Sequence, residues 1–214
     1  MDIFVITSVI NTGNNRWSYT DIRSCYTPEE RLAQTIQTIE SIRNIHCKVL
    51  LVECSNIDEQ TENILKSKVD YYLQTYHDAD VRMACLESDK KGFGEIKKLE
   101  KACEYIKNNN IIFNKLFKIS GRYYLNSLFD VKKYSDDIFT FKIFSTSGST
   151  VLYSVPYSRF DFYIKMLEEC SNIYINGPIG LETILPNLCV PRQEIQTLGV
   201  SGFVAVLNND FYTA

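Results

Sequence analysis

Ile3-Phe4-Val5-Ile6-Thr7-Ser8-Val9-Ile10 is the stretch that decides the fold of this chain. Its residues are mostly β-branched and apolar at both alternating positions, which is typical of a strand buried on both faces inside a parallel sheet. Parallel neighbours can be joined only by a crossover, and that crossover is usually a helix. The stretch therefore predicts that helices and strands alternate along the residues that follow.

That alternation continues for more than a hundred residues. A helix should begin at Thr27-Pro28-Glu29-Glu30, where threonine is the N-cap, proline fits the first helical position and glutamate closes a capping box. Its expected apolar face consists of Leu32, Ile36, Ile39 and Ile42. Apolar periodicity also predicts helices over about 58–68 and 94–108, and strands over 48–53, 69–76 and 115–119. Strands separated in this way by helices predict a doubly wound parallel sheet.

The second half of the chain has a different pattern. Two predicted strands, over 138–144 and 150–155, flank Ser145-Thr146-Ser147-Gly148-Ser149, a hairpin turn that makes them antiparallel. A helix over about 158–170, a shorter helix after Asn176-Gly177-Pro178 and a strand over 203–207 follow. The expected fold class is α/β, a three-layer domain with a central mixed, mostly parallel sheet of about six strands flanked by helices.

Composition limits the function classes that remain. The 214 residues carry 23 basic and 26 acidic side chains, a net charge of −3, which argues against a nucleic-acid binder that works by broad neutralisation of phosphates. Seven cysteines without a Cys-x-x-Cys pair indicate reduced thiols in a reducing compartment. Neither a signal peptide nor an apolar run of about 18 residues is visible. We therefore expect a soluble, cytoplasmic protein without a membrane span, and its oligomeric state stays open.

Polar residues end the four predicted parallel strands. Ligands in open α/β sheets bind at the carboxyl ends of the strands. The chain has neither the Gly-x-Gly-x-x-Gly of a dinucleotide-binding turn after its first strand nor a P-loop, so other groups must hold a ligand there. The candidate ligand-binding residues at these ends are Ser8, Asn11, Glu53, Tyr76 and Arg122.

Two ways of holding a diphosphate are present at these strand ends. Asp78 and Asp80 lie one residue apart beyond the third predicted strand, where they can reach one divalent cation, Mn²⁺ or Mg²⁺, unless they only solvate a loop. Arg122 could instead bind phosphate through its bidentate guanidinium, unless it forms a surface ion pair. Lys90 and Lys91, at the start of the central helix, could also meet a phosphate or form a solvated charge run.

Three motifs together resemble the glycosyltransferases of the GT-A fold, and more narrowly those that build capsid glycans in chlorella viruses. The motifs are Phe4-Val5-Ile6-Thr7-Ser8, His77-Asp78-Ala79-Asp80 and Phe117-Lys118-Ile119-Ser120-Gly121-Arg122-Tyr123. The resemblance covers the whole chain and implies a uridine-diphosphate sugar as donor, a glycan acceptor, Mn²⁺ or Mg²⁺ on Asp78 and Asp80, and the cytoplasm of an infected host cell. It also implies one glycosyltransferase domain over 1–214, with a nucleotide-binding half over about 1–125 and an acceptor-side half over about 126–214, consistent with excision from a longer chain. The chain departs from most GT-A enzymes, because they carry Asp-x-Asp on the strand that here ends in Ser120-Gly121-Arg122.

The resemblance also implies a general base in the second half of the chain. Inverting enzymes of this fold usually take it from a carboxylate at a helix start, and Glu182 in Gly177-Pro178-Ile179-Gly180-Leu181-Glu182 fits that description. A first-turn glutamate without any catalytic role is the alternative, and Asp161 and Asp130 are weaker candidates.

Two further readings of function stay open beside the glycosyltransferase. A nucleotidyltransferase acting on a sugar phosphate is disfavoured, because the first loop contains only one glycine, Gly13. A non-enzymatic α/β binding module, in which the Asp-x-Asp is incidental, is the other reading.

Overall fold

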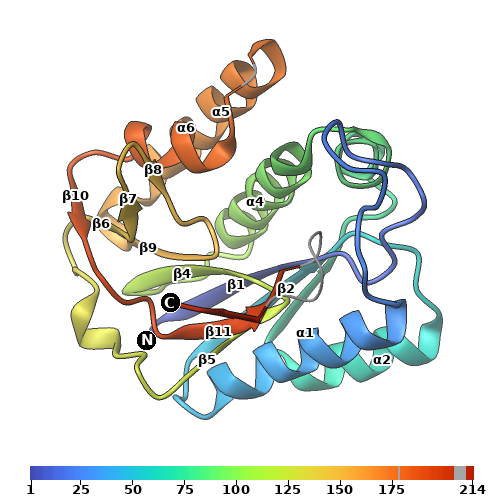
Figure 1. Ribbon diagram of the computed structural model, residues 1–214. Coiled ribbons are helices and arrows are strands. Elements are labelled where there is room, and N and C mark those ends of the chain that lie inside the picture. The colour runs from blue at the N-terminus through green and yellow to red at the C-terminus, as the bar shows by residue number, and fades with distance from the viewer. Residues whose placement is uncertain (178, 205–210) are drawn as a thin grey trace.

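The computed structural model describes residues 1–177, 179–204 and 211–214, which form a three-layer α/β structure (Figure 1). Within these residues the central sheet has seven strands, in the order β10-β6-β9-β4-β1-β2-β3. They are β1 (Ile3–Ser8), β2 (Lys48–Glu53), β3 (Tyr71–Gln74), β4 (Lys115–Ser120), β6 (Phe139–Phe141), β9 (Leu152–Pro156) and β10 (Arg192–Glu194). The predicted α/β class with a mixed, mostly parallel sheet is confirmed. The extra edge strand, β10, reads Arg-Gln-Glu and has no apolar alternation by which the sequence could announce it.

The parallel half of the sheet is centred on β1, whose six residues are all buried. β1 pairs in parallel with β2 and with β4, and β2 pairs in parallel with β3. Crossover helices join these strands, as the opening stretch predicts. The elements between the strands are α1 (Pro28–Arg43), α2 (Glu59–Lys68), α3 (Ala79–Arg82), the π-helix η1 (Met83–Glu87) and α4 (Lys91–Asn108). The carboxyl ends of β1, β2, β3 and β4 therefore meet at one edge of the sheet.

Alternate residues of β1 divide the core between the two faces of the sheet. Ile3 and Val5 belong to the core cluster formed with α4, α5 (Phe160–Asn176) and α6 (Leu181–Leu188). Phe4 and Ile6 belong to the cluster formed with α1, α2 and a small second sheet. Both faces are therefore covered, which explains why the strand is apolar at every position up to Ile6.

Helix α1 begins where the sequence predicts. The Thr27 side chain accepts a hydrogen bond from the backbone N–H of Glu30, and the Glu30 carboxylate accepts one from the N–H of Thr27 at 2.8 Å, which completes the capping box. Its buried face differs from the expected one in the first turns, because Leu32 and Ile36 are only half-buried. The buried positions of α1 are Arg31, Gln34, Thr35, Thr38, Ile39 and Ile42.

The second half adds the antiparallel strands. β6 and β9 pair antiparallel, and β9 pairs antiparallel with β4, which joins the two halves of the sheet. The predicted hairpin between them is present, and it forms its own short ribbon of β7 (Ile143–Phe144) and β8 (Ser147–Gly148) around Ser145, which has a φ of 57°. Two 3₁₀ segments, η2 (Val131–Lys133) and η3 (Tyr157–Arg159), precede β6 and α5.

A three-stranded antiparallel sheet lies beside α1 (Figure 1). It consists of β5 (Tyr123–Leu125), β11 (Val200–Phe203) and β12 (Phe211–Thr213), with β11 in the middle. The strand expected over 203–207 therefore begins earlier, at Val200, because Val200 packs into the core beneath it. Residues 205–207 of that prediction lie outside the described residues.

Two sequence expectations concern the whole chain. None of the helices in the described residues is long and apolar enough to cross a membrane. No disulfide joins the seven cysteines, all of which lie in the described ranges, and five of them are buried: Cys54, Cys85, Cys103, Cys170 and Cys189.

Candidate functional site

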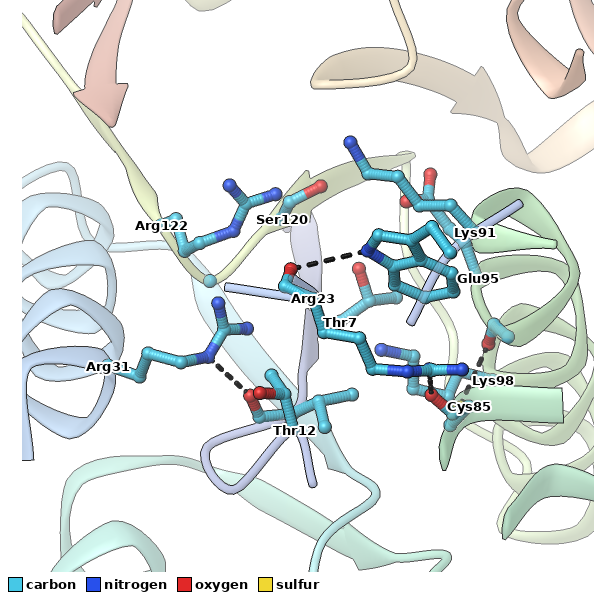
Figure 2. A pocket seen from close by; sticks show the side chains of 14 residues that line it. Thr7, Thr12, Arg23, Arg31, Cys85, Lys91, Glu95, Lys98, Ser120 and Arg122 are labelled. Carbon is cyan, nitrogen blue, oxygen red and sulfur yellow. Dashed lines mark hydrogen bonds between the residues drawn. The ribbon is translucent and has the colours of Figure 1, made fainter. Parts of the chain in front are cut away.

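A cleft opens at the carboxyl ends of β1 and β4 (Figure 2). Its walls come from the loop after β1, the buried start of α1, the π-helix η1, the first turns of α4 and the turn after β4. Strand ends at this edge are where open α/β sheets bind their ligands. The cleft is therefore the expected ligand-binding site.

Among the residues that the structure describes, five cationic side chains line this cleft, together with one carboxylate, that of Glu95. Across the part of the chain that the structure describes, none of the five forms an ion pair within 4.0 Å with a carboxylate. The chain as a whole carries a net charge of −3, so this concentration of positive charge is local. The five are Arg23, Arg31, Lys91, Lys98 and Arg122.

Arg31 and Lys98 are fixed by backbone carbonyls that do not neutralise them. Arg31 Nε donates to the carbonyl of Val9 at 2.6 Å, and Lys98 Nζ donates to the carbonyl of Ser8 at 3.2 Å. Burial, and next the charge of Arg122, lower the pKa of Arg31 to about 9, while the nearby Glu53 carboxylate works in the opposite direction. Crowding of like charges in a desolvated wall is the arrangement of a site that an anion would relieve.

Arg23 has a structural task instead. Its Nε donates to the carbonyl of Asn15 at 2.6 Å, Nη1 donates to that of Cys85 at 2.6 Å, and Nη2 donates to that of Ser88. Its guanidinium also lies 3.9 Å from the centre of the Trp17 ring. Arg23 thereby ties the loop after β1 to the π-helix η1 and shapes the wall of the cleft.

Arg122 lies in the cleft wall, where the sequence predicts a ligand-binding residue (Figure 2). Its Nη1 donates to the carbonyl of Phe203 at 3.1 Å, and its guanidinium lies 5.4 Å from the ring centre of Tyr123. The preceding Gly121 packs closely, because a Cβ there would lie 3.1 Å from Thr35 Oγ1. The surface ion pair considered as an alternative for Arg122 is not found with any described residue.

Lys91 stands at the mouth of the cleft as the first residue of α4, and its side chain is exposed. Partial enclosure by the cleft walls, and next the charge of Arg122, lower its pKa, which Glu182 and Glu95 partly offset. The neighbouring Lys90 has a different role, because its Nζ donates to the carbonyls of Tyr174 and Ile175 near the end of α5. Of the two lysines considered for phosphate, Lys91 is the one in the cleft.

The other four predicted ligand-binding residues, Ser8, Asn11, Glu53 and Tyr76, do not line the cleft. Glu53 is wholly buried, and its Oε1 accepts hydrogen bonds from the N–H of Ile10 at 3.0 Å and from Ser55 Oγ at 2.5 Å. Ser55 Oγ also accepts from the N–H of Asn11 at 3.1 Å. These strand-end groups are used to fold the loop after β1.

The side chains of Ser8 and Tyr76 also contact other parts of the protein and do not line the cleft. The Ser8 hydroxyl lies 3.2 Å from Thr35 Oγ1, on the side of the sheet covered by α1. Tyr76 follows the edge strand β3 and packs its ring edge-on to His77, 5.5 Å between centres. Alternation along a strand, which the position of a strand end does not reveal, decides which face such a side chain reaches.

Asp78 and Asp80 do not fit the predicted cation site. Asp78 is the N-cap of α3: its Oδ1 accepts from the N–H of Asp80 and of Val81, and its Oδ2 lies 3.0 Å from Lys101 Nζ. Partial burial raises the pKa of Asp78, but Lys101 and the two backbone amides lower it further, so the net shift is downward. Asp80 is exposed in the first turn of the same helix, and neither carboxylate lines the cleft. No group of three or more metal-binding side chains occurs among the described residues.

Glu182 lies in a second hollow next to the cleft, which is also lined by Ser18, Tyr19, Lys90 and Tyr174. It is exposed in the first turn of α6, and its Oε1 lies 3.5 Å from Thr150 Oγ1. The cleft and the second hollow share Lys91 and Glu95.

The weaker acidic candidates lie elsewhere. Asp161, in the first turn of α5, pairs with Lys107 at 2.9 Å, and Asp130 caps η2 through the N–H of Lys132. Neither lines the cleft or the second hollow.

Sequence reasoning missed Arg31, Lys98 and Glu95. A signal for Arg31 was available: Arg31, Thr35 and Thr38 are spaced at i, i+4 and i+7, so they form a polar stripe on the buried side of α1. Lys98 and Glu95 adjoin the apolar stripe of α4 in the same way. Ionisable residues on the inner face of a helix are rarely buried without a partner or a ligand, which marks these positions.

The fold of this chain is also found in a protein of known structure. No protein-family model matches the chain, and no curated protein matches it. A nucleoside-diphosphate-sugar pyrophosphorylase from Vibrio cholerae RC9 is similar in structure, with a TM-score of 0.51 and 9% identity over 94% of both chains. A glycosyltransferase involved in glycosylation of the major capsid of PBCV-1 gives a TM-score of 0.46 and 10% identity over 92% of this chain and 84% of its own. The apo-form glycosyltransferase GlyE of Streptococcus pneumoniae TIGR4 gives a TM-score of 0.48 and 10% identity over 90% of this chain and 44% of its own. The first of these similarities establishes a shared fold.

Proposed function

We propose that this protein is a glycosyltransferase that moves a sugar from a uridine-diphosphate sugar to a glycan acceptor. The observation that carries the proposal is the group of cleft cations without carboxylate partners among the described residues, at the strand ends where this fold binds ligands. A nucleoside diphosphate is an anion whose negative charge these cations would balance. The uridine base and the glycan acceptor come from the sequence resemblance and are the finer part of the proposal.

The diphosphate would lie against Arg31, Lys91 and Arg122. Arg122 and Arg31 offer guanidinium N–H groups that no carboxylate among the described residues neutralises, and Lys91 adds an exposed charge in the lining of the cleft. When the bond to the sugar breaks, negative charge grows on the departing diphosphate, and fixed cations stabilise that charge more than they stabilise the ground state. No step is assigned to a metal ion, because both oxygens of Asp78 are already engaged by the α3 backbone and by Lys101.

The acceptor would enter from the second hollow, which contains Glu182 and which we therefore call the acceptor hollow. Its carboxylate is exposed there and could take the proton from an attacking hydroxyl. Tyr19, 61% exposed, and Tyr174 provide aromatic surface in the same hollow. Amphipathic rings of this kind suit a ligand with apolar faces and polar edges.

A nucleotidyltransferase is the second candidate, because the V. cholerae protein that shares the fold is named a nucleoside-diphosphate-sugar pyrophosphorylase. The same cations could hold a nucleoside triphosphate. The two reactions differ in their products: glycosyl transfer releases uridine diphosphate, whereas nucleotidyl transfer between uridine triphosphate and a sugar 1-phosphate releases pyrophosphate.

The experiment that tests the proposal combines thermal unfolding with product analysis. Uridine diphosphate in EDTA is expected to raise Tm by roughly 5–10 °C at about 100 times its Kd, because a ligand at that concentration stabilises the folded state by about 2.7 kcal/mol. Uridine, which lacks phosphates, is the control and should give a much smaller shift. Uridine diphosphate released from uridine-diphosphate sugars would support glycosyl transfer, and pyrophosphate would support the second candidate. Equal Tm shifts with uridine and uridine diphosphate would refute the diphosphate site.

Asp80→Ala distinguishes nucleotide binding through a metal ion on Asp80 from nucleotide binding by the cations of the cleft. The cleft predicts that this variant binds uridine diphosphate within about twofold of wild type, with Mn²⁺ or with EDTA, whereas a cation on Asp80 predicts a loss of roughly 1–3 kcal/mol seen only with Mn²⁺. Isothermal titration in the two buffers measures the difference. Asp78→Ala is a useful companion, because loss of an N-cap costs about 1 kcal/mol of folding stability without any change in nucleotide binding.

A further inference from the structure

Glu95 is the carboxylate that the cleft and the acceptor hollow share. It lies one turn after the start of α4, and its side chain is 22% exposed. Among the described residues, only Lys91 accompanies it in lining both spaces. A carboxylate repels phosphate, so Glu95 has no place in the diphosphate site itself. Its position between the two spaces needs another explanation.

A buried lysine holds Glu95 there. Lys118 lies in the middle of β4 with 0% of its side chain exposed, and its Nζ donates to Glu95 Oε1 at 2.5 Å. The same Nζ donates to Ser120 Oγ at 2.8 Å and to the carbonyl of Thr150 at 2.5 Å. All three ammonium donors are thereby used. Within the described part of the chain, the second oxygen of Glu95, Oε2, has no hydrogen bond and stays available to a ligand.

The lysine also connects Glu95 with the acceptor side. Thr150, which accepts from Lys118 through its carbonyl, places its hydroxyl 3.5 Å from Glu182 Oε1. One buried ammonium group therefore joins β4, α4 and the segment that contacts α6. Burying a lysine in the middle of the central sheet is unfavourable unless its charge is paired, so the position of its partner carboxylate is well defined.

We propose that Glu95 binds hydroxyl groups of the sugar carried by the diphosphate, and that Lys118 is the positioning residue that holds its carboxylate for them. This rests on the proposed function. A diphosphate held by Arg31 and Arg122 leads its sugar toward the acceptor hollow, and Glu95 lies where the two spaces join. Sugar hydroxyls donate hydrogen bonds, and Oε2 accepts them. Glu95, held by Lys118, therefore favours a group with several hydroxyls between the cleft and the acceptor hollow, and disfavours an additional phosphate there.

Glu95→Gln tests this assignment. Lys118 can only donate hydrogen bonds, so it should bind the amide oxygen of the glutamine. The amide NH₂ then faces the cleft, where it cannot accept a hydrogen bond from a sugar hydroxyl. The Kd of at least one donor among uridine-diphosphate glucose, galactose and N-acetylglucosamine should rise by about tenfold or more. The Kd of uridine diphosphate itself should stay within about twofold or fall, because a negative charge near the phosphates is removed.

Lys118→Met tests the positioning role, since it keeps the length of the stem but releases Glu95. It should weaken the same sugar nucleotides while sparing uridine diphosphate, a selectivity that a general loss of stability would not produce. Two matched controls are Glu100→Gln, on the same helix and paired with Lys97 at 2.7 Å, and Lys115→Met, on the same strand and paired with Asp136 at 2.5 Å. Both should leave all these affinities unchanged.

The outcomes are distinguishable. Equal changes in Kd for uridine diphosphate and for every sugar nucleotide in Glu95→Gln would overturn the assignment while leaving the diphosphate site in place. The assignment is also wrong if wild type binds uridine diphosphate and, in wild type and in every variant, each of the three sugar nucleotides has the same Kd as uridine diphosphate. If wild type binds none of these ligands, the proposed function fails and the assignment fails with it. Should Lys118→Met not fold, Glu95→Gln decides alone.

Discussion

Glu182→Gln is expected to lower the rate of sugar transfer by about 10²–10⁴-fold, the usual contribution of a general base. Glu182 is exposed in the acceptor hollow, next to the residues that this hollow shares with the cleft. Glutamine keeps the shape of the side chain and its place in the first turn of α6, but it cannot take a proton. The affinity for uridine diphosphate should stay within about twofold, because the diphosphate site is formed by other residues. Turnover and nucleotide titration, measured on the same preparation, give both values.

Asp161→Asn is the matched control for this base. Asp161 also lies in the first turn of a helix in the second half, but it pairs with Lys107 and lines neither the cleft nor the acceptor hollow. Its replacement should leave turnover nearly unchanged. A fall of less than tenfold in Glu182→Gln would show that another group accepts the proton, and a large fall in Asp161→Asn would point to that carboxylate instead.

Arg122→Ala is expected to weaken binding of uridine diphosphate by roughly 10–100-fold, the scale of a lost hydrogen bond to a charged group. The guanidinium projects from the turn after β4 into the cleft and forms no ion pair with a described residue, so it is available to phosphate. Arg122→Lys should recover part of the affinity, because lysine keeps the charge but lacks the fork. Titration in EDTA at low and at moderate salt measures both variants, and the salt dependence should be shallower in Arg122→Ala.

Arg16→Ala is the control for Arg122. Arg16 belongs to the loop after β1, has a side chain 77% exposed and pairs with Asp21 at 3.5 Å, so its loss should change nucleotide affinity little. Three equal affinities for wild type, Arg122→Lys and Arg122→Ala would show that this arginine takes no part in the site.

The elements of the parallel half could be predicted from the sequence because their signals are local. The continuous apolar run at Ile3–Ile6 predicts a strand covered on both faces, and the capping box at Thr27 predicts the start of α1. Hydrophobic period and cap chemistry depend on residues within a few positions of each other. β10 could not be predicted in this way, since its three polar residues become a strand only by pairing with β6.

The site was less predictable because its members come from distant segments. The position of Arg122 after a buried strand predicted that it would lie at the strand ends, where it lines the cleft, whereas the role of Glu182 as a base stays a prediction. The Asp-x-Asp was a misleading signal for the cleft, because the carboxylate of Asp78 satisfies the N-terminal amides of α3 and the charge of Lys101, which the motif by itself does not show. The strand ends indicated the edge of the sheet at which the cleft opens but not which side chains line it.

By itself the sequence determined the α/β class, the place of β1 inside the parallel sheet and the edge of the sheet at which the cleft opens. Only the tertiary structure decided that Arg31 of α1 and Lys98 of α4 meet Arg122 at that edge, and that Lys118 holds Glu95 between the two hollows. The physical reason is one of range. Backbone elements form from periodicity and capping within a few residues, whereas a binding site depends on charges that burial and packing bring together from segments far apart in the chain.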